Sequence, residues 1–229
     1  MQRIFLFLYP MTENKIIEKT TEFVKRTLAD AEGGHDWFHI QRVLNNARLI
    51  AREERVNNFV VVLGVLLHDI ADPKFYDGDE SIGPKKATEF LRSLHVDNAV
   101  IDHVVKIIEH VSFKNSLSAG GSQFDSPELQ VVRDADRLDA IGAIGIARAF
   151  NYGGFKNREI YNPDIAPNPG MSKEEYKKST TPTINHFYEK LLLLKDKMTT
   201  ETGQRIARER HRFMELYLEQ FYNEWNGTE

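Results

Sequence analysis

Apolar residues recur at spacings of three and four along most of the chain, the pattern of helices that bury one face. Runs in which apolar and polar residues alternate between hairpin turns, as in half-buried strands, do not occur. The sequence therefore predicts an all-α fold. Helices are expected over residues 15–28 (capped by Thr12), 36–54, 59–67, 83–94, 96–111, 127–150, 173–194 and 202–225.

Two segments interrupt the helical pattern. Residues 112–126 contain Gly120-Gly121 and several serines, and residues 151–170 contain Gly153-Gly154 and three prolines, so both are expected to be loops. The first loop is either a lid or a plain surface connection. The second combines aromatic side chains with two cations, residue types that can stack on a charged ligand and neutralise it.

Length and composition are those of one domain. A chain of 229 residues with 41% hydrophobic content can bury a single core, and we predict one domain over residues 13–229. Residues 1–12 contain an apolar run too short to span a bilayer. They are expected to be a disordered or misannotated start, with Met11 as the initiator, and the rival interpretation is a shortened signal peptide.

Charge and cysteine content exclude several classes of protein. The 30 basic and 34 acidic residues give a net charge of -4 without a long basic run, so neither nucleic acid nor a membrane is expected as a partner. The absence of cysteine rules out disulfides and thiolate metal sites, which leaves His and carboxylate as strong ligands. These donors favour a harder ion such as Mn, Mg, Ni, Co or Fe. Cytoplasmic location is the default expectation.

The pair His68-Asp69 ends the most apolar segment of the chain, residues 59–67. An imidazole beside a carboxylate at the end of a core helix needs compensation, because burying either group without a partner costs several kcal/mol. A bound divalent cation would provide that compensation.

His39 heads an apolar stripe that continues through Val43 and Ala47 on the expected second helix. Taken alone, a histidine in this position is more often a hydrogen-bonded core residue than a metal ligand. His35 lies one turn earlier, at the loop junction, and is either a second polar group of this region or an exposed residue. Asp36 is suited to cap the helix.

The acids of residues 131–143 separate on a helical projection. Asp136 shares a face with apolar residues, whereas Asp134 points to nearly the opposite side. Asp136 is therefore the better ligand candidate, and the alternative is a buried ion pair with Arg137 or Arg133. Asp139 could orient a metal-binding histidine.

His39, His68-Asp69 and Asp136, in this order along the chain, form a pattern that resembles that of the HD-domain metal-dependent phosphohydrolases. More narrowly, they are similar to the small bacterial YedJ and YpgQ branch, from about residue 20 to the C-terminal helix, with an HD core at about 35–140. The matching motifs are His35-Asp36-x-x-His39-x-x-Arg42-Val43, His68-Asp69-Ile70, Ser112-Phe113 and Asp134-Ala-Asp136-Arg137-Leu138-Asp139-Ala140-x-Gly142-Ala143-x-Gly145.

The resemblance implies an HD-type helical fold in which His39, His68, Asp69 and Asp136 hold one divalent metal ion. It also implies hydrolysis of nucleotides by a metal-activated water, as in a nucleoside triphosphate pyrophosphohydrolase. Asp72, with Asp69, would serve the chemistry by orienting the water or accepting its proton, although Asp72 could instead cap a turn. Contacts to the substrate are assigned to His35, Lys74, Lys114, Lys156 and Arg158, and either Lys74 or Lys114 could equally be a surface lysine.

A second metal ion is the weaker expectation. In two-metal HD enzymes a further histidine after the His-Asp pair binds the second ion, and His103 and His110 lie seven residues apart on one helical face. However, the histidine that the branch has before Ser-Phe is Val111 here, which argues against a second ion.

Two other functions remain open at this point. One is a two-iron HD-type oxygenase, and the other is a nucleotide-binding module without turnover. The C-terminal helix also leaves room for a homodimer, although packing within the chain is the favoured explanation of its large side chains. These side chains are Phe213, Leu216, Tyr217, Phe221 and Tyr222.

Overall fold

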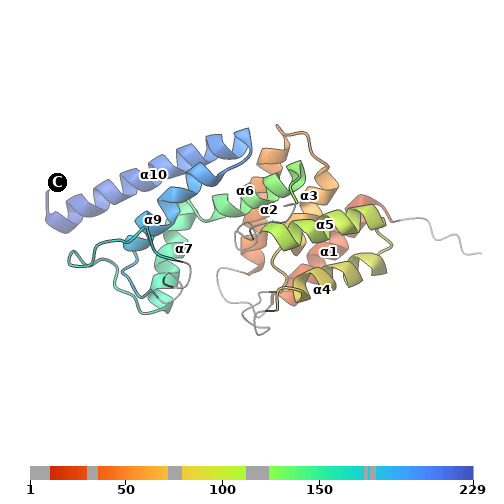
Figure 1. Ribbon diagram of the computed structural model, residues 1–229, viewed down its shortest axis with the longest axis horizontal. Coiled ribbons are helices and arrows are strands. Elements are labelled where there is room, and N and C mark those ends of the chain that lie inside the picture. Colours follow the sequence, from red (N-terminus) through yellow and green to blue (C-terminus); the bar gives the residue numbers. More distant parts are fainter. Residues whose placement is uncertain are drawn as a thin grey trace, which may run out of the picture. The chain divides into compact units, whose positions relative to one another are not determined.

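The computed structural model (Figure 1) describes residues 11–29, 36–71, 79–111, 124–172, 175 and 179–228. Every element of regular structure in these residues is helical, which confirms the all-α prediction. The chain divides into two compact units, Met1–Leu44 with Val56–Val132, and Asn45–Arg55 with Arg133–Glu229. Of the three boundaries between them, 44/45 and 132/133 fall inside the continuous helices α2 (Trp37–Ala51) and α6 (Pro127–Asp139), and 55/56 lies in the segment after α2. The single domain stays a prediction.

The first unit is built around α3 (Asn58–Leu67), whose residues are buried except for the N-terminal Asn58 and the partly exposed Val62. Asn57 caps this helix by accepting hydrogen bonds from the amides of Phe59 and Val60. The other helices of this unit are α1 (Glu13–Thr27), α4 (Ile82–Ser93) and α5 (Asn98–Val111). Helix α3 packs against α1 and α5, and α5 packs against α4.

Close contacts in the first unit depend on side-chain size. A Cβ on Gly64 of α3 would lie 3.2 Å from Cγ2 of Ile107, so glycine lets α3 and α5 approach each other. Phe23 of α1 stacks on Phe90 of α4 with ring centroids 4.0 Å apart. Thr12 caps α1 as predicted, by accepting from the amide of Lys15.

The second unit contains α7 (Gly142–Phe155), α9 (Asn185–Glu189), the 3-10 helix η3 (Leu191–Lys197) and α10 (Glu201–Asn226). Helix α10, drawn in blue in Figure 1, packs against α7 and η3, and α9 packs against η3. Helix α10 has 26 residues, but neither it nor any other described helix is both long and apolar enough to cross a membrane.

Aromatic packing holds α10 in the second unit. Tyr217 stacks on Phe187 with ring centroids 5.9 Å apart, and Phe221 and Tyr222 both contact the ring of Tyr161. Packing within the chain therefore accounts for Tyr217, Phe221 and Tyr222. In contrast, Phe213 and Leu216 are 50% and 54% exposed, and the homodimer stays a prediction.

The prediction of one helix over residues 127–150 is wrong. Helix α6 ends at Asp139 and α7 starts at Gly142, which has a φ of +74°. This left-handed conformation suits glycine, and a Cβ there would also lie 3.0 Å from the side chain of Arg210. The periodicity continues across the break, so the pattern of apolar residues does not reveal it. Helix α7 also runs on to Phe155, into the segment predicted as a loop.

The prediction of a helix over residues 173–194 is also wrong in its described part. Residues 179–182 are irregular, and helical structure resumes only with the short α9 and η3. Pro182 explains part of the difference, because proline restricts the residue before it to extended conformations.

Asp134 fastens the start of α10. Its carboxylate is fully buried and accepts hydrogen bonds from the backbone amides of Thr199 and Thr200 and from both threonine hydroxyls. A Cβ on Gly203 would lie 2.6 Å from Oδ2 of Asp134, so glycine permits this close approach. Asp134 therefore has a structural role, which the sequence did not predict, because the helical projection only placed this acid away from the face of Asp136.

Candidate metal centre

His68 is held at the end of α3 by its own helix. Its Nδ1 lies 2.8 Å from the carbonyl oxygen of Val65, one of the last carbonyls of α3, which lack partners within the helix. A carbonyl can only accept, so Nδ1 carries the proton and Nε2 keeps its lone pair. This tautomer is the one that a metal-binding histidine uses when its other nitrogen donates to the protein.

His39 lies in the first turns of α2 and is almost completely buried, with 2% of its surface exposed. Asp36 caps this helix as predicted, because its carboxylate accepts from the amide of His39 at 2.9 Å. The imidazole rings of His39 and His68 have their centroids 5.6 Å apart at an angle of 62°. Two histidines from different helices thus face the same small volume.

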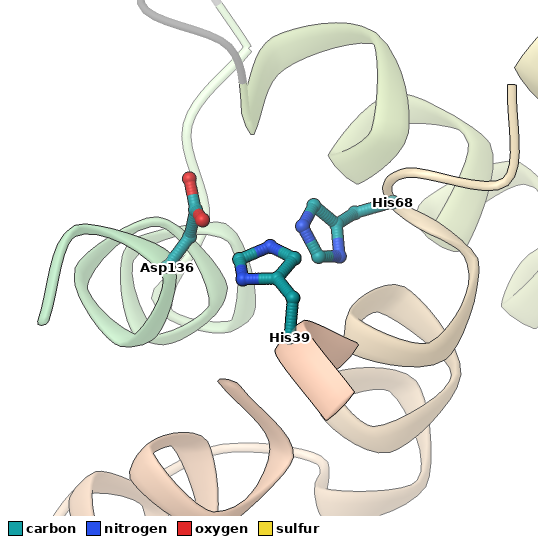
Figure 2. A group of neighbouring side chains, drawn as sticks. All are labelled: His39, His68 and Asp136. Atoms are coloured by element: carbon teal, nitrogen blue, oxygen red, sulfur yellow. The ribbon is translucent and has the colours of Figure 1, made fainter. Parts of the chain in front are cut away.

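Asp136 joins the two histidines. His39, His68 and Asp136 each offer one ligand atom, and these atoms lie within 4.8 Å of one another. Figure 2 shows the three side chains rising from α2, from the end of α3 and from α6. Ligand atoms bound to one ion at about 2.0–2.2 Å lie roughly 3–4 Å apart, so the three residues fit a divalent cation with only small adjustments.

Arg137, one of the two arginines considered as ion-pair partners of Asp136, pairs with Asp134 instead. Arg137 donates to the carbonyl of Lys197, and its guanidinium lies 3.6 Å from the Asp134 carboxylate. Burial lowers the pKa of Arg137, and Asp134 opposes this shift more than Asp136 does. Asp134 is thus the main acidic partner of Arg137, whereas a pairing of Asp136 with Arg133 stays an alternative.

Asp69 is half-buried beside His68, but it does not belong to the group of three ligand atoms. Its assignment as a fourth ligand stays a prediction. The sequence also assigned roles to His35, Asp72, Lys74 and Lys114, which lie outside the described residues.

Lys156 and Arg158 lie just beyond the end of α7, beside two aromatic rings. Lys156 Nζ is 4.8 Å from the ring centroid of Phe155, and Arg158 Cζ is 5.6 Å from that of Tyr152. Arg158 also donates to the carbonyl of Ser179 at 2.7 Å. The cations and rings of the predicted binding loop are therefore neighbours, with Phe155 68% exposed.

Arg158 also affects His186 in α9. Burial, together with Lys190 and Arg158, lowers the pKa of His186 to about 3. The unfolded chain binds a proton at His186 below about pH 6.5, whereas the folded chain does not until about pH 3. Stability should therefore fall as the pH drops through this window. Urea unfolding from pH 7 to 4 should show a shallower loss in His186→Gln, and equal slopes would contradict the prediction.

His103 has a structural partner. Its Nε2 lies 2.9 Å from Oγ of Ser126 and 3.5 Å from the carboxylate of Glu128. Oγ of Ser126 in turn accepts a hydrogen bond from the amide of Leu129, in the first turn of α6. His110 contacts the carbonyl of Lys106 through Nδ1. Among the described residues, neither histidine belongs to a group with metal-binding geometry.

We therefore expect His103→Gln to leave the metal content at one ion per chain. The substitution should lower the free energy of unfolding by about 1 kcal/mol or less, because glutamine only partly replaces the contact of His103 with Ser126, which caps α6. Elemental analysis and urea unfolding would measure the two effects. A fall from two ions to one would instead establish a second metal at His103.

Comparison with known proteins places the chain in a family. Residues 37–141 match the model of the HD domain. Uncharacterized protein YpgQ of Bacillus subtilis is 35% identical over 219 residues, which cover 96% of this chain and 98% of YpgQ. The chain belongs to the HD-domain family.

Solved structures extend the similarity over nearly the whole chain. An HD-superfamily hydrolase from Bacillus thuringiensis is 43% identical, with a TM-score of 0.75, and the match covers 94% of this chain and 99% of that one. Bacillus subtilis YpgQ in complex with ADP is 34% identical, with a TM-score of 0.72, covering 93% and 97%. The predicted family and the HD-type helical fold are thus confirmed.

Proposed function

We propose that this protein is a metal-dependent phosphohydrolase that cleaves nucleotides, with nucleoside triphosphates as the first candidates. The observation that carries the proposal is the meeting of His39, His68 and Asp136 within 4.8 Å, with His68 Nδ1 tied to a backbone carbonyl. Two imidazoles and a carboxylate are ligands that suit Mn, Mg, Ni, Co or Fe. We include Asp69 as the fourth ligand.

Four protein ligands leave positions open on an octahedral ion, as in catalytic rather than structural sites. When bound, such an ion polarises a phosphoryl oxygen and lowers the pKa of coordinated water. The protein holds the donors in place: His68 is fixed by Val65, and His39 is buried on a capped helix. Asp72 is proposed to orient the attacking water or to accept its proton.

Two observations support a nucleotide as the substrate. YpgQ, a relative that aligns with nearly the whole chain, has been crystallised with ADP. In addition, the exposed rings of Tyr152 and Phe155 lie beside Lys156 and Arg158. Such rings can stack on a base, and such cations can pair with phosphate oxygens. We assign further phosphate contacts to His35, Lys74 and Lys114.

A substrate screen tests the proposal. The full chain would be stripped of metal, reloaded with Mn²⁺, Mg²⁺, Co²⁺ or Ni²⁺, and incubated with nucleoside tri-, di- and monophosphates and with bis-phosphoesters. Chromatography would identify the nucleotide product, and separate assays would distinguish pyrophosphate from orthophosphate. Metal-dependent turnover of a nucleotide is expected. Protein that holds one ion per chain but converts none of these substrates would refute the proposal.

A further inference from the structure

Asn46 links the helix that carries His39 to the helix that carries Asp136. It is a buried residue of α2, and its Nδ2 donates to the carbonyl of Ala135 in α6 at 3.1 Å. Asn46 follows His39 by seven residues, two turns of one helix, so it lies on the same face about 10 Å further along. Ala135 directly precedes Asp136.

Arg210 completes this link from α10. Its Nη2 donates to Oδ1 of Asn46 at 2.8 Å, and its Nη1 donates to the carbonyl of Leu138 at 2.5 Å. One guanidinium therefore joins the side chain of Asn46 to the last turn of α6. Arginine suits this position because its planar fork offers two donors in fixed directions.

The last turn of α6 needs these partners. The final carbonyls of a helix have no partner within it, and they carry partial negative charge. Arg210 binds the carbonyl of Leu138, and Arg148 binds both the carbonyl and the carboxylate of Asp139. Two cations thus bind the last two residues of α6, just before the turn that leads to Gly142.

Burying the guanidinium of Arg210 is energetically unfavourable. Burial lowers the pKa of Arg210, and the nearby carboxylate of Asp139 opposes that shift. Gly142 also leaves room for the arginine, since a Cβ there would lie 3.0 Å from its side chain. The guanidinium of Arg210 is thus buried although its burial is unfavourable, and Gly142 leaves space for it. Both facts indicate that Arg210 has a specific positioning role.

We propose that Asn46 and Arg210 are positioning residues, which hold Asp136 at the place on α6 where it meets the two histidines. The proposal rests on the metal site described above. Asp136 lies between Ala135 and Leu138, the two residues whose carbonyls the pair binds. Loosening either contact would let the last turn of α6 shift and would move the carboxylate away from His39 and His68.

Arg210→Lys tests the proposal, with Arg205→Lys as its control. Lysine keeps the charge but cannot reach Asn46 and Leu138 with two fixed donors. Arg205 lies on the same helix but is about half exposed and donates to Glu53 instead. Titration of the metal-free full chain with Mn²⁺ should show a dissociation constant about tenfold higher for Arg210→Lys and no change for Arg205→Lys.

Two further measurements separate positioning from loss of fold. Circular dichroism should show equal helix content in all proteins, and excess Mn²⁺ should restore Arg210→Lys to one ion per chain. Asn46→Asp, which keeps the acceptor for Arg210 but loses the donor to Ala135, should also weaken Mn²⁺ binding. Unchanged binding in folded Arg210→Lys and Asn46→Asp would overturn the positioning role, whereas wild-type protein that binds Mn²⁺ without turning over nucleotides would refute only the proposed activity.

Discussion

His68→Ala and Asp136→Ala are each expected to abolish stoichiometric metal binding and, with it, hydrolysis. Each substitution removes one of the three donors that lie within 4.8 Å of one another. Loss of an outer-shell partner typically lowers metal affinity roughly 10- to 100-fold, and loss of a ligand should exceed that range. Elemental analysis after gel filtration and titration with Mn²⁺ would measure the effect.

A matched histidine variant provides the control. His95 is exposed and has a φ of +56°, so asparagine, which tolerates the left-handed region, is the suitable replacement. His95→Asn should bind one ion and retain activity. Full metal occupancy in folded His68→Ala or Asp136→Ala would show that the ligand assignment is wrong.

Asp134→Ala is expected to cause the largest loss of stability, about 3 kcal/mol. The substitution leaves the amides of Thr199 and Thr200 without their acceptor at a buried position. It also removes the carboxylate against which Gly203 packs. Urea unfolding followed by circular dichroism would measure the change.

Asp196→Ala is the control for this variant, because Asp196 is an exposed acid in the neighbouring η3. Its stability should change by less than about 0.5 kcal/mol. If Asp134→Ala destabilised the protein as little as the control, the role of Asp134 in fastening α10 would be refuted.

Most helices could be predicted because their signals are local. Thr12 and Asp36 cap their helices as expected, and the apolar run ending at Leu67 forms the buried helix α3. The two errors differ in kind: Pro182 locally interrupts the helix predicted over residues 173–194, whereas the break before Gly142 interrupts a continuous apolar pattern. Gly142 has a left-handed φ of +74°, and the side chain of Arg210, far away in sequence, packs beside it.

The candidate ligands could also be read from the sequence. His39 and Asp136 are polar residues on apolar helix faces, and burial of such groups requires a partner. The same reasoning could have singled out Asn46, which repeats the position of His39 after two turns, but an amide has many ordinary partners and gave no comparable signal. Arg210 and Arg148 gave no such signal either, because arginine is common on exposed helix faces and its presence there predicts no particular contact.

The sequence by itself determined the helical fold, the HD family and the residues that meet at the metal centre, because periodicity, caps and short motifs depend on neighbouring residues. Only the tertiary structure decided what the two other acids of this segment do: Asp134 holds the start of α10, and Asp139 pairs with Arg148. The contact between Arg210 and Asn46 joins residues 164 positions apart. Local patterns carry no information about such pairs, which form only when the whole chain is folded.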